Sequence, residues 1–179
     1  MSCRPPTRPD LPRQAPPQVD GAGSGTILRE VLAAADLLAQ DWGIQAEVWS
    51  ATSFSEIDRE ARMVERWNRL NPDAEPRTSH VATCLPGRAP VIAATDYVRA
   101  YPGMIAAHLE ARYTVLGTDG FGRSDTRTKL RQFFEVDRHH IVLAALTALA
   151  REQGCPRTLP GAAITRYGIA SGSPPPWAI

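Results

Sequence analysis

The strongest restriction on the fold of this chain is the alternation of strand-like and helix-like segments along it. Four short segments are typical of strands, at residues 45–50, 79–85, 91–95 and 112–116. Around them, apolar residues recur every three or four positions, as they do on the buried face of a helix. Strands that alternate with helices usually pair in the same direction. The pattern therefore predicts an α/β fold, a three-layer sandwich with a mainly parallel sheet.

The expected helices have recognisable ends. The first should begin after a cap at Ser24 or Thr26 and end before Gly43, and the second should begin after Ser53 or Ser55. Asparagine followed by proline ends the second helix near residue 71. Further helices are expected at about residues 96–109, through residue 134, at 137–154 and from residue 160 onward. The third contains Pro102-Gly103, a pair that disfavours a continuous helix.

Proline is concentrated at the two ends of the chain. Six of the 16 prolines lie within the first 17 residues, and three close the chain as Pro174-Pro175-Pro176. Proline lacks the backbone N–H group that helices and sheets use. We therefore expect a disordered proline-rich segment at residues 1–22, one folded domain at residues 23–168, and a disordered tail at residues 169–179.

Charge and cysteine content exclude several classes of protein. The chain has 20 Lys and Arg against 19 Asp and Glu, a net charge of +1, so it lacks the basic excess of a nucleic-acid-binding protein. No apolar run approaches the roughly 20 residues of a membrane span, and the N-terminal segment lacks the apolar core of a secretory signal. Cys3, Cys84 and Cys155 have no metal-ligand spacing and are expected to be reduced thiols. We therefore expect a cytoplasmic protein.

One glycine-rich segment stands where a strand should lead into a helix. Residues 117–124 fit the pattern Gly-x-x-x-x-Gly-basic-Ser, which is close to a phosphate-binding loop. Arg123 occupies the lysine position of that motif, and the two side chains bind phosphate differently. The alternative interpretation is a tight turn, with Ser124 or Asp125 capping the next helix. Glycines at positions 21, 23 and 25 are not expected to form a dinucleotide site, because no strand is expected before them.

Histidines and carboxylates give no further indication of a site. His139 and His140 are neighbours on an expected helix, so they point about 100° apart and cannot hold one metal ion together. The charged residues at positions 58–69 are typical of a solvated helix face with ion pairs between successive turns. We identify no catalytic, cofactor-binding or metal-binding residue from the sequence.

Several strings of residues, in order and with regular spacing, resemble a known family. They are GSGTILRE at residues 23–30, EVWSATSFSE at 47–56, ERWNRL at 65–70, ATDY at 94–97 and YTVLGTDGFGRSDTR at 113–127. Together they are similar to the C-terminal domain of the bacterial, homodimeric pyruvate dehydrogenase component that depends on thiamine diphosphate. A shorter form of the last string also occurs in transketolases, which share this domain.

The resemblance implies a fold like the transketolase C-terminal domain and a role in building a homodimer. In the intact enzyme it implies thiamine diphosphate and Mg²⁺, decarboxylation of pyruvate, and transfer of the acetyl group to the lipoyl group of an acyltransferase component. The cofactor residues of the family lie mainly in preceding domains. In this sequence Thr118-Asp119-Gly120 lacks the first glycine of the cofactor motif, and no asparagine follows it. We therefore expect no cofactor to be bound by this chain alone.

The glycine-rich segment is then expected to be a structural or interface loop. Its candidate residues are Asp119, Gly120, Phe121, Gly122, Arg123, Ser124 and Asp125. Possible partners are a second copy, a full-length subunit and the acyltransferase component; no nucleic-acid or membrane partner is expected. Two alternatives stay open: a non-catalytic dimerisation or interaction module, and the same domain of a related 2-oxo acid dehydrogenase or transketolase.

The sequence departs from the family where the first strand of the domain should lie. Residues 13–20 are rich in proline and polar residues, and such a segment is not expected in the centre of a sheet. The departure suggests that the first strand is lost, through a truncated or rearranged reading frame or because the chain is a separated fragment. We expect the isolated chain to be inactive.

Overall fold

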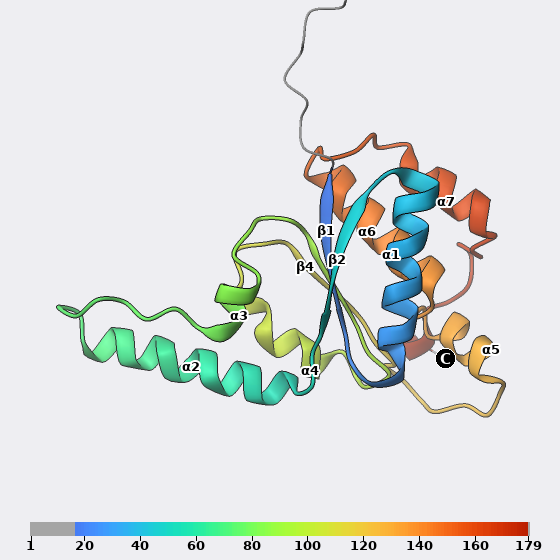
Figure 1. The fold of residues 1–179 in the computed structure, drawn as a ribbon. Helices are drawn as coiled ribbons and strands as arrows, with labels where there is room; N and C mark the ends of the chain where they lie inside the picture. The colour runs from blue at the N-terminus through green and yellow to red at the C-terminus, as the bar shows by residue number, and fades with distance from the viewer. Residues whose placement is uncertain (1–16, 179) are drawn as a thin grey trace, which may run out of the picture.

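Four parallel strands form the centre of the structure, a computed structural model that describes residues 17–178. The sheet has the order β2-β1-β3-β4 (Figure 1). The strands are β1 (Gln18–Gly23), β2 (Gln45–Ser50), β3 (Val91–Ala94) and β4 (Tyr113–Leu116). Three strands were predicted at almost these bounds. All the pairings are parallel, so the predicted mainly parallel α/β sheet is confirmed.

The position of β1 corrects the prediction that the first strand is missing. β1 begins directly after Pro17 and is hydrogen-bonded to a neighbour on each side, so it is a central strand. A Cβ atom on Gly21 would lie 2.7 Å from a methyl group of Val31. The strand is therefore built from small residues because a helix passes close to it, and it has no long apolar run by which it could be recognised. Residues 18–22 belong to the domain rather than to a disordered segment; residues 1–16 lie outside the described residues.

One face of the sheet is covered by α1 (Leu28–Trp42) and α6 (Arg138–Arg151), and α7 (Leu159–Tyr167) packs on α6 (Figure 1). The predicted stripe of α1 faces the sheet and packs with the apolar face of α6. Its buried members are Val31, Ala34 and Leu38, and Ile27, directly before the helix, continues the buried stripe. Burying one such aliphatic side chain contributes about 1.5–3 kcal/mol, so this layer holds much of the stability of the domain.

The other face is covered by α2 (Phe54–Leu70), α3 (His80–Cys84), α4 (Ala100–Gly103) and the 3-10 helix η2 (Met104–His108). A second core of Phe54, Ala61, Val81, Val91, Ala93 and Ile105 lies there. Helices on both faces make the predicted three-layer sandwich. The predicted strand at residues 79–85 is wrong: the Ser79 hydroxyl accepts a hydrogen bond from the backbone N–H of Ala82 and begins α3. The predicted helix at 96–109 is also shorter, and it changes from α4 to η2 directly after Pro102-Gly103.

Several predicted helix ends are confirmed and one is not. Ser53 caps α2, Asp137 caps α6, and Gly43 ends α1 in the left-handed conformation. Neither Ser24 nor Thr26 caps α1, which instead continues from the 3-10 helix η1 (Gly25–Ile27). The remaining helix, α5 (Arg127–Phe133), follows a long loop after β4. None of the described helices is long and apolar enough to cross a membrane.

The end of the chain also differs from the prediction. The 3-10 helix η3 (Pro176–Ala178) follows α7, and Pro176 is buried. A Cβ atom on Gly120 would lie 2.7 Å from the carbonyl oxygen of Pro176, so η3 packs directly on the loop after β4. The expected disorder of residues 169–179 is therefore wrong for residues 176–178; residue 179 is not among the described residues.

Candidate functional site

The loops that leave the carboxyl ends of β1, β3 and β4 meet at one edge of the sheet. Ser24, after β1, shares a 2.8 Å hydrogen bond with the hydroxyl of Thr95, after β3. The hydroxyl of Thr26 donates to the Asp96 carboxylate over 3.2 Å. Carboxyl ends of parallel strands lie at the same edge, which explains why residues about 70 positions apart in the sequence are bonded here.

The predicted loop, residues 117–125, is fixed to the segment that follows β3. The Thr118 hydroxyl donates to the backbone oxygen of Asp96 over 2.7 Å, and the Thr118 N–H donates to the oxygen of Tyr97 over 2.9 Å. The Asp119 carboxylate accepts the backbone N–H of Arg99 at 2.9 Å and lies 3.9 Å from the Arg99 guanidinium. The start of the loop is therefore a rigid structural tie.

The rest of the loop turns outward. Gly120 has a φ of 102°, which a residue with a side chain rarely adopts. The next side chain, Phe121, is 84% exposed. The Arg123 guanidinium lies 4.2 Å from the centre of the Phe133 ring, an arrangement that favours a cation–π contact.

The cap of the next helix was predicted one or two residues too early. The Thr126 hydroxyl accepts the N–H of Lys129 and caps α5. The Asp125 carboxylate accepts a hydrogen bond of 2.7 Å from the Thr126 N–H and so helps to hold the capping residue in place. Neither Ser124 nor Asp125 is the cap itself. The predicted tight turn is also not formed, because the ten residues between β4 and α5 make a long loop without a hydrogen-bonded turn.

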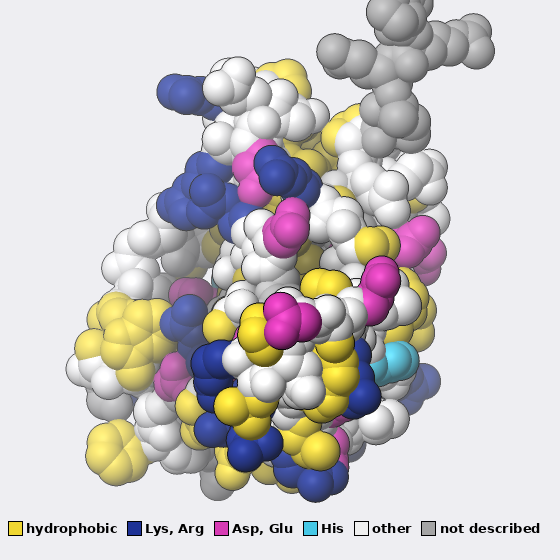
Figure 2. Space-filling model, turned by 90° about the vertical axis from the view of Figure 1, so that its left-hand side faces the viewer, with side chains coloured by type: hydrophobic (Ala, Val, Ile, Leu, Met, Phe, Trp, Pro, Cys, Tyr) yellow, Lys and Arg dark blue, Asp and Glu magenta, His cyan; other side chains and the backbone are white. Residues whose placement is uncertain are grey.

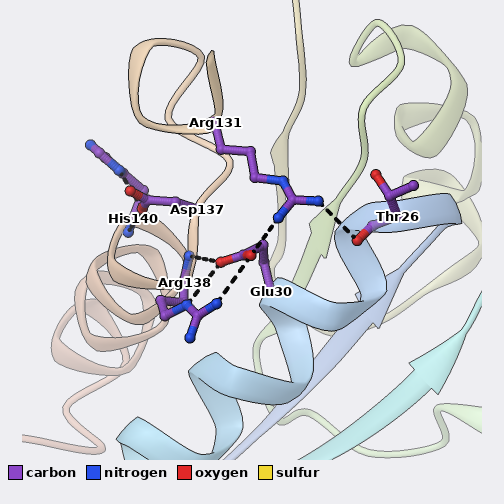
Figure 3. Close-up of polar contacts among 6 residues, drawn as sticks. All are labelled: Thr26, Glu30, Arg131, Asp137, Arg138 and His140. Atoms are coloured by element: carbon purple, nitrogen blue, oxygen red, sulfur yellow. Dashed lines mark hydrogen bonds and ion pairs between the residues drawn. The ribbon is translucent and has the colours of Figure 1, made fainter. Parts of the chain in front are cut away.

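Sequence reasoning missed a buried carboxylate beside this loop (Figure 3). Glu30 of α1 is 4% exposed. Its oxygens lie 2.7 Å from the guanidinium of Arg131 and 2.9 Å from that of Arg138, and one also accepts the Arg138 backbone N–H at 3.1 Å. Burial favours the neutral acid, but the two arginines outweigh it and hold the pKa of Glu30 below its ordinary value. Glu30 therefore ties α1 to α5 and α6.

The signal for Glu30 was present in the α1 pattern. Glu30 follows Ile27 by three positions and precedes Ala34 by four, so it lies on the buried face of the helix. A carboxylate in such a stripe needs a cationic partner. The partners could not be identified from the pattern, because they lie 101 and 108 positions further along the chain.

The two neighbouring histidines have different surroundings, as their positions on a helix predict. His140 bonds through Nδ1 to the Asp137 carboxylate over 2.7 Å (Figure 3), whereas His139 stacks on Tyr167 with ring centres 4.7 Å apart. Within residues 17–178 no three His, Cys, Asp or Glu residues are grouped so that they could hold a metal ion.

The surroundings of Asp119 do not fit the cofactor that the family resemblance implies. A carboxylate that binds the Mg²⁺ of a diphosphate has to offer a free oxygen to the ion. Both oxygens of Asp119 face Arg99 instead. Asp119 in this position therefore does not offer a free oxygen to a Mg²⁺ ion.

Known proteins match most of the chain. A family model described as a transketolase-like TK C-terminal domain matches residues 11–137. The pyruvate dehydrogenase E1 component of Cupriavidus necator is 54% identical over 164 residues, which is 91% of this chain and 18% of that protein. The corresponding protein of Pseudomonas aeruginosa is 54% identical over 159 residues, covering 88% and 18%, and that of Escherichia coli K12 is 43% identical over 148 residues, covering 82% and 17%.

A solved structure has the same fold. A split-gene transketolase, described as an inactive beta4 tetramer, matches with a TM-score of 0.51 and 17% sequence identity. The match covers 75% of this chain and 40% of that one. The chain spans less than a fifth of the length of the E1 components from Cupriavidus necator and Pseudomonas aeruginosa.

Proposed function

Because the chain belongs to the family of transketolase-like C-terminal domains, we propose that it serves as the C-terminal domain of a pyruvate dehydrogenase E1 component. The observation that carries this proposal is the 54% identity with two E1 components over about nine-tenths of the chain. The related 2-oxo acid dehydrogenases and transketolases are the alternative, and the long match to E1 components favours pyruvate dehydrogenase over them.

In this proposal the domain has an assembly role and the chemistry takes place elsewhere in the enzyme. The larger part of the E1 component would bind thiamine diphosphate and Mg²⁺, decarboxylate pyruvate in the cytoplasm, and pass the acetyl group to the lipoyl group of the acyltransferase component. The carboxyl-edge loops support this division, since Thr118 and Asp119 are used in bonds that hold the domain together. The domain would help to form the homodimer.

Two surfaces are candidates for contact with the rest of the enzyme. One is the 117–125 loop, where Phe121 is 84% exposed. The other is the outer face of α2, where basic and apolar side chains lie together (Figure 2). Met63 of this helix is 63% exposed and lies in a groove that is also lined by Arg59, Arg62, Glu65, Arg66 and Arg69. Methionine and arginine are both enriched in protein interfaces relative to the rest of the protein surface.

The proposal is tested by rebuilding the enzyme from parts. A C. necator E1 component that lacks the aligned 164 residues is mixed with this chain, thiamine diphosphate, Mg²⁺ and pyruvate. We expect the reduction of an artificial electron acceptor only when both parts are present. Turnover by this chain alone would contradict the assembly role, and absence of both binding and turnover in the mixture would contradict the E1 assignment.

A matched pair of variants separates the two surfaces. Phe121→Ser changes the loop and Met63→Ser changes α2, and both side chains are exposed, so neither change should unfold the domain. The variant that weakens association with the truncated E1 component identifies the contact. If the chain binds an intact E1 component instead and no activity depends on it, the interaction-module alternative is favoured.

A further inference from the structure

A cavity of about 570 Å³ lies between the 117–125 loop, η1 and α5. This volume is within the range of roughly 300–1,000 Å³ that is usual for small-molecule sites. The cavity has two kinds of lining. Arg123, Arg127 and Arg131 supply guanidinium groups, and Ile27, Leu130, Phe134 and Val136 supply apolar surface.

The cavity lies where open α/β sheets bind ligands. The chain leaves β1 toward β2 and leaves β3 toward β4, and β1 and β3 are neighbours in the sheet. The connections pass over opposite faces, α1 on one and η2 on the other. Such a reversal opens a crevice at the carboxyl ends of the two strands. Thr26 and Asp96, which follow these two strands, both line the cavity.

Two arginines of the cavity form no ion pair within the described part of the chain and are available to bind an anion. Arg131 is bound to Glu30, and Glu30 is also bound to Arg138, so this carboxylate does not neutralise the other arginines. Arg123 and Arg127 have no carboxylate within ion-pair distance in the described part of the chain. Asp96 accepts a hydrogen bond from the Thr26 hydroxyl and Asp125 from the Thr126 N–H. Both donors are uncharged, so the two carboxylates keep their charge, and the lining holds one more arginine than it holds carboxylates.

We propose that this cavity binds a small organic phosphate. Guanidinium groups match phosphate oxygens with paired N–H donors, so Arg123 and Arg127 would hold the phosphoryl group at the open side. The apolar floor would contact the organic part, which free phosphate lacks. The cation–π contact with Phe133 places the Arg123 guanidinium in one position and lowers the entropy lost on binding. The site is built from this chain alone and does not depend on the pyruvate dehydrogenase assignment.

The test uses the full chain and three probes of related chemistry. Calorimetry measures binding of phenyl phosphate, phenol and inorganic phosphate. We expect phenyl phosphate to bind with a Kd of about 1 mM or lower, and the other two to bind at least tenfold more weakly. If inorganic phosphate binds as tightly as phenyl phosphate, the ligand is a free anion and the proposal of an organic phosphate is wrong. If phenol binds as tightly, the arginines do not contribute to binding.

Variants connect the binding to this cavity. Arg123→Gln combined with Arg127→Gln should weaken phenyl phosphate binding roughly tenfold or more, since both charged donors are lost. Arg157→Gln removes an exposed arginine between α6 and α7 and should leave the Kd unchanged. In the unaltered chain, amide resonances of Thr26, Thr118 and Leu130 should shift on titration. Undiminished binding by the double variant, or shifts confined to other regions, would refute the site.

Discussion

Replacing Asp20 by asparagine should stabilise the domain, and the gain should depend on pH. Asp20 lies in the central strand β1 and is 8% exposed. Its neighbour in register on β2 is Glu47, another acid. Burial first, and then the charge of Glu47, raise the pKa of Asp20 from 3.8 to about 6. The ionised form is therefore less favourable in the folded chain than in the unfolded one.

The magnitude follows from the two pKa values. At about 1.36 kcal/mol per pH unit, a rise from 3.8 to about 6 corresponds to about 3 kcal/mol. Below pH 3.8 Asp20 is protonated in both the folded and the unfolded chain, so its charge does not weaken the fold. As the pH rises from 3.8 to about 6, the unfolded chain releases the proton more readily than the folded chain, so the free energy of unfolding falls. Above about pH 6 this contribution is constant. Asparagine has nearly the same shape and no charge. The variant should thus exceed the parent by about 3 kcal/mol at pH 7.5 and by only about 1 kcal/mol at pH 4.5.

Urea unfolding at pH 4.5, 6.0 and 7.5, followed by circular dichroism, measures both free energies of unfolding. Glu47→Gln serves as the control, because it removes the neighbouring charge and leaves Asp20 buried. Its gain at pH 7.5 should be smaller than that of Asp20→Asn, since burial is the larger cause of the raised pKa. Equal stability of Asp20→Asn and the parent at pH 7.5, or a gain that is the same at every pH, would refute the reasoning.

Three further changes test other contacts. Glu30→Gln should cost about 3 kcal/mol in urea unfolding near neutral pH, because it leaves two arginines without their buried partner; the cost should shrink as the pH falls through the lowered pKa of Glu30. Gly120→Ala should cost about 2 kcal/mol and change the tryptophan fluorescence, since the new methyl group would meet η3 and the φ of 102° is strained. His108→Gln should destabilise the chain more at pH 5 than at pH 9. Burial favours the neutral ring of His108, but hydrogen bonds to Asp58 and Glu65 raise its pKa, so its contribution is present at low pH and lost as the pH rises through that value. An unchanged difference across this range would contradict the double carboxylate contact.

The parts of the fold that could be predicted are the helices and strands whose own residues show a recognisable pattern. The stripe of α1 and the apolar run of β3 are both visible in the local sequence, and both are buried in the structure. The N-cap of α6 at Asp137 is local as well, because the side chain and the N–H it accepts are three residues apart.

The parts that were not predictable depend on what packs against them. β1 is central because small residues let α1 come close, and nothing in residues 18–23 alone reveals that helix. The segment at residues 79–85 has strand-like residues, but the cap at Ser79 and its contact with the second core make it a helix. The site follows the same division: the loop was recognised from its glycines, whereas the Glu30 contacts join residues from three helices.

The Glu30 contacts also restrict how this sequence can evolve. One carboxylate serves Arg131 and Arg138, so a mutation that removes any one of the three leaves a charge without its full set of partners. We therefore expect neutral drift at these positions to be slow unless compensating changes arise nearly together. Among homologues, the three codons should change as a group, and a neutral residue at position 30 should accompany the loss of both arginines.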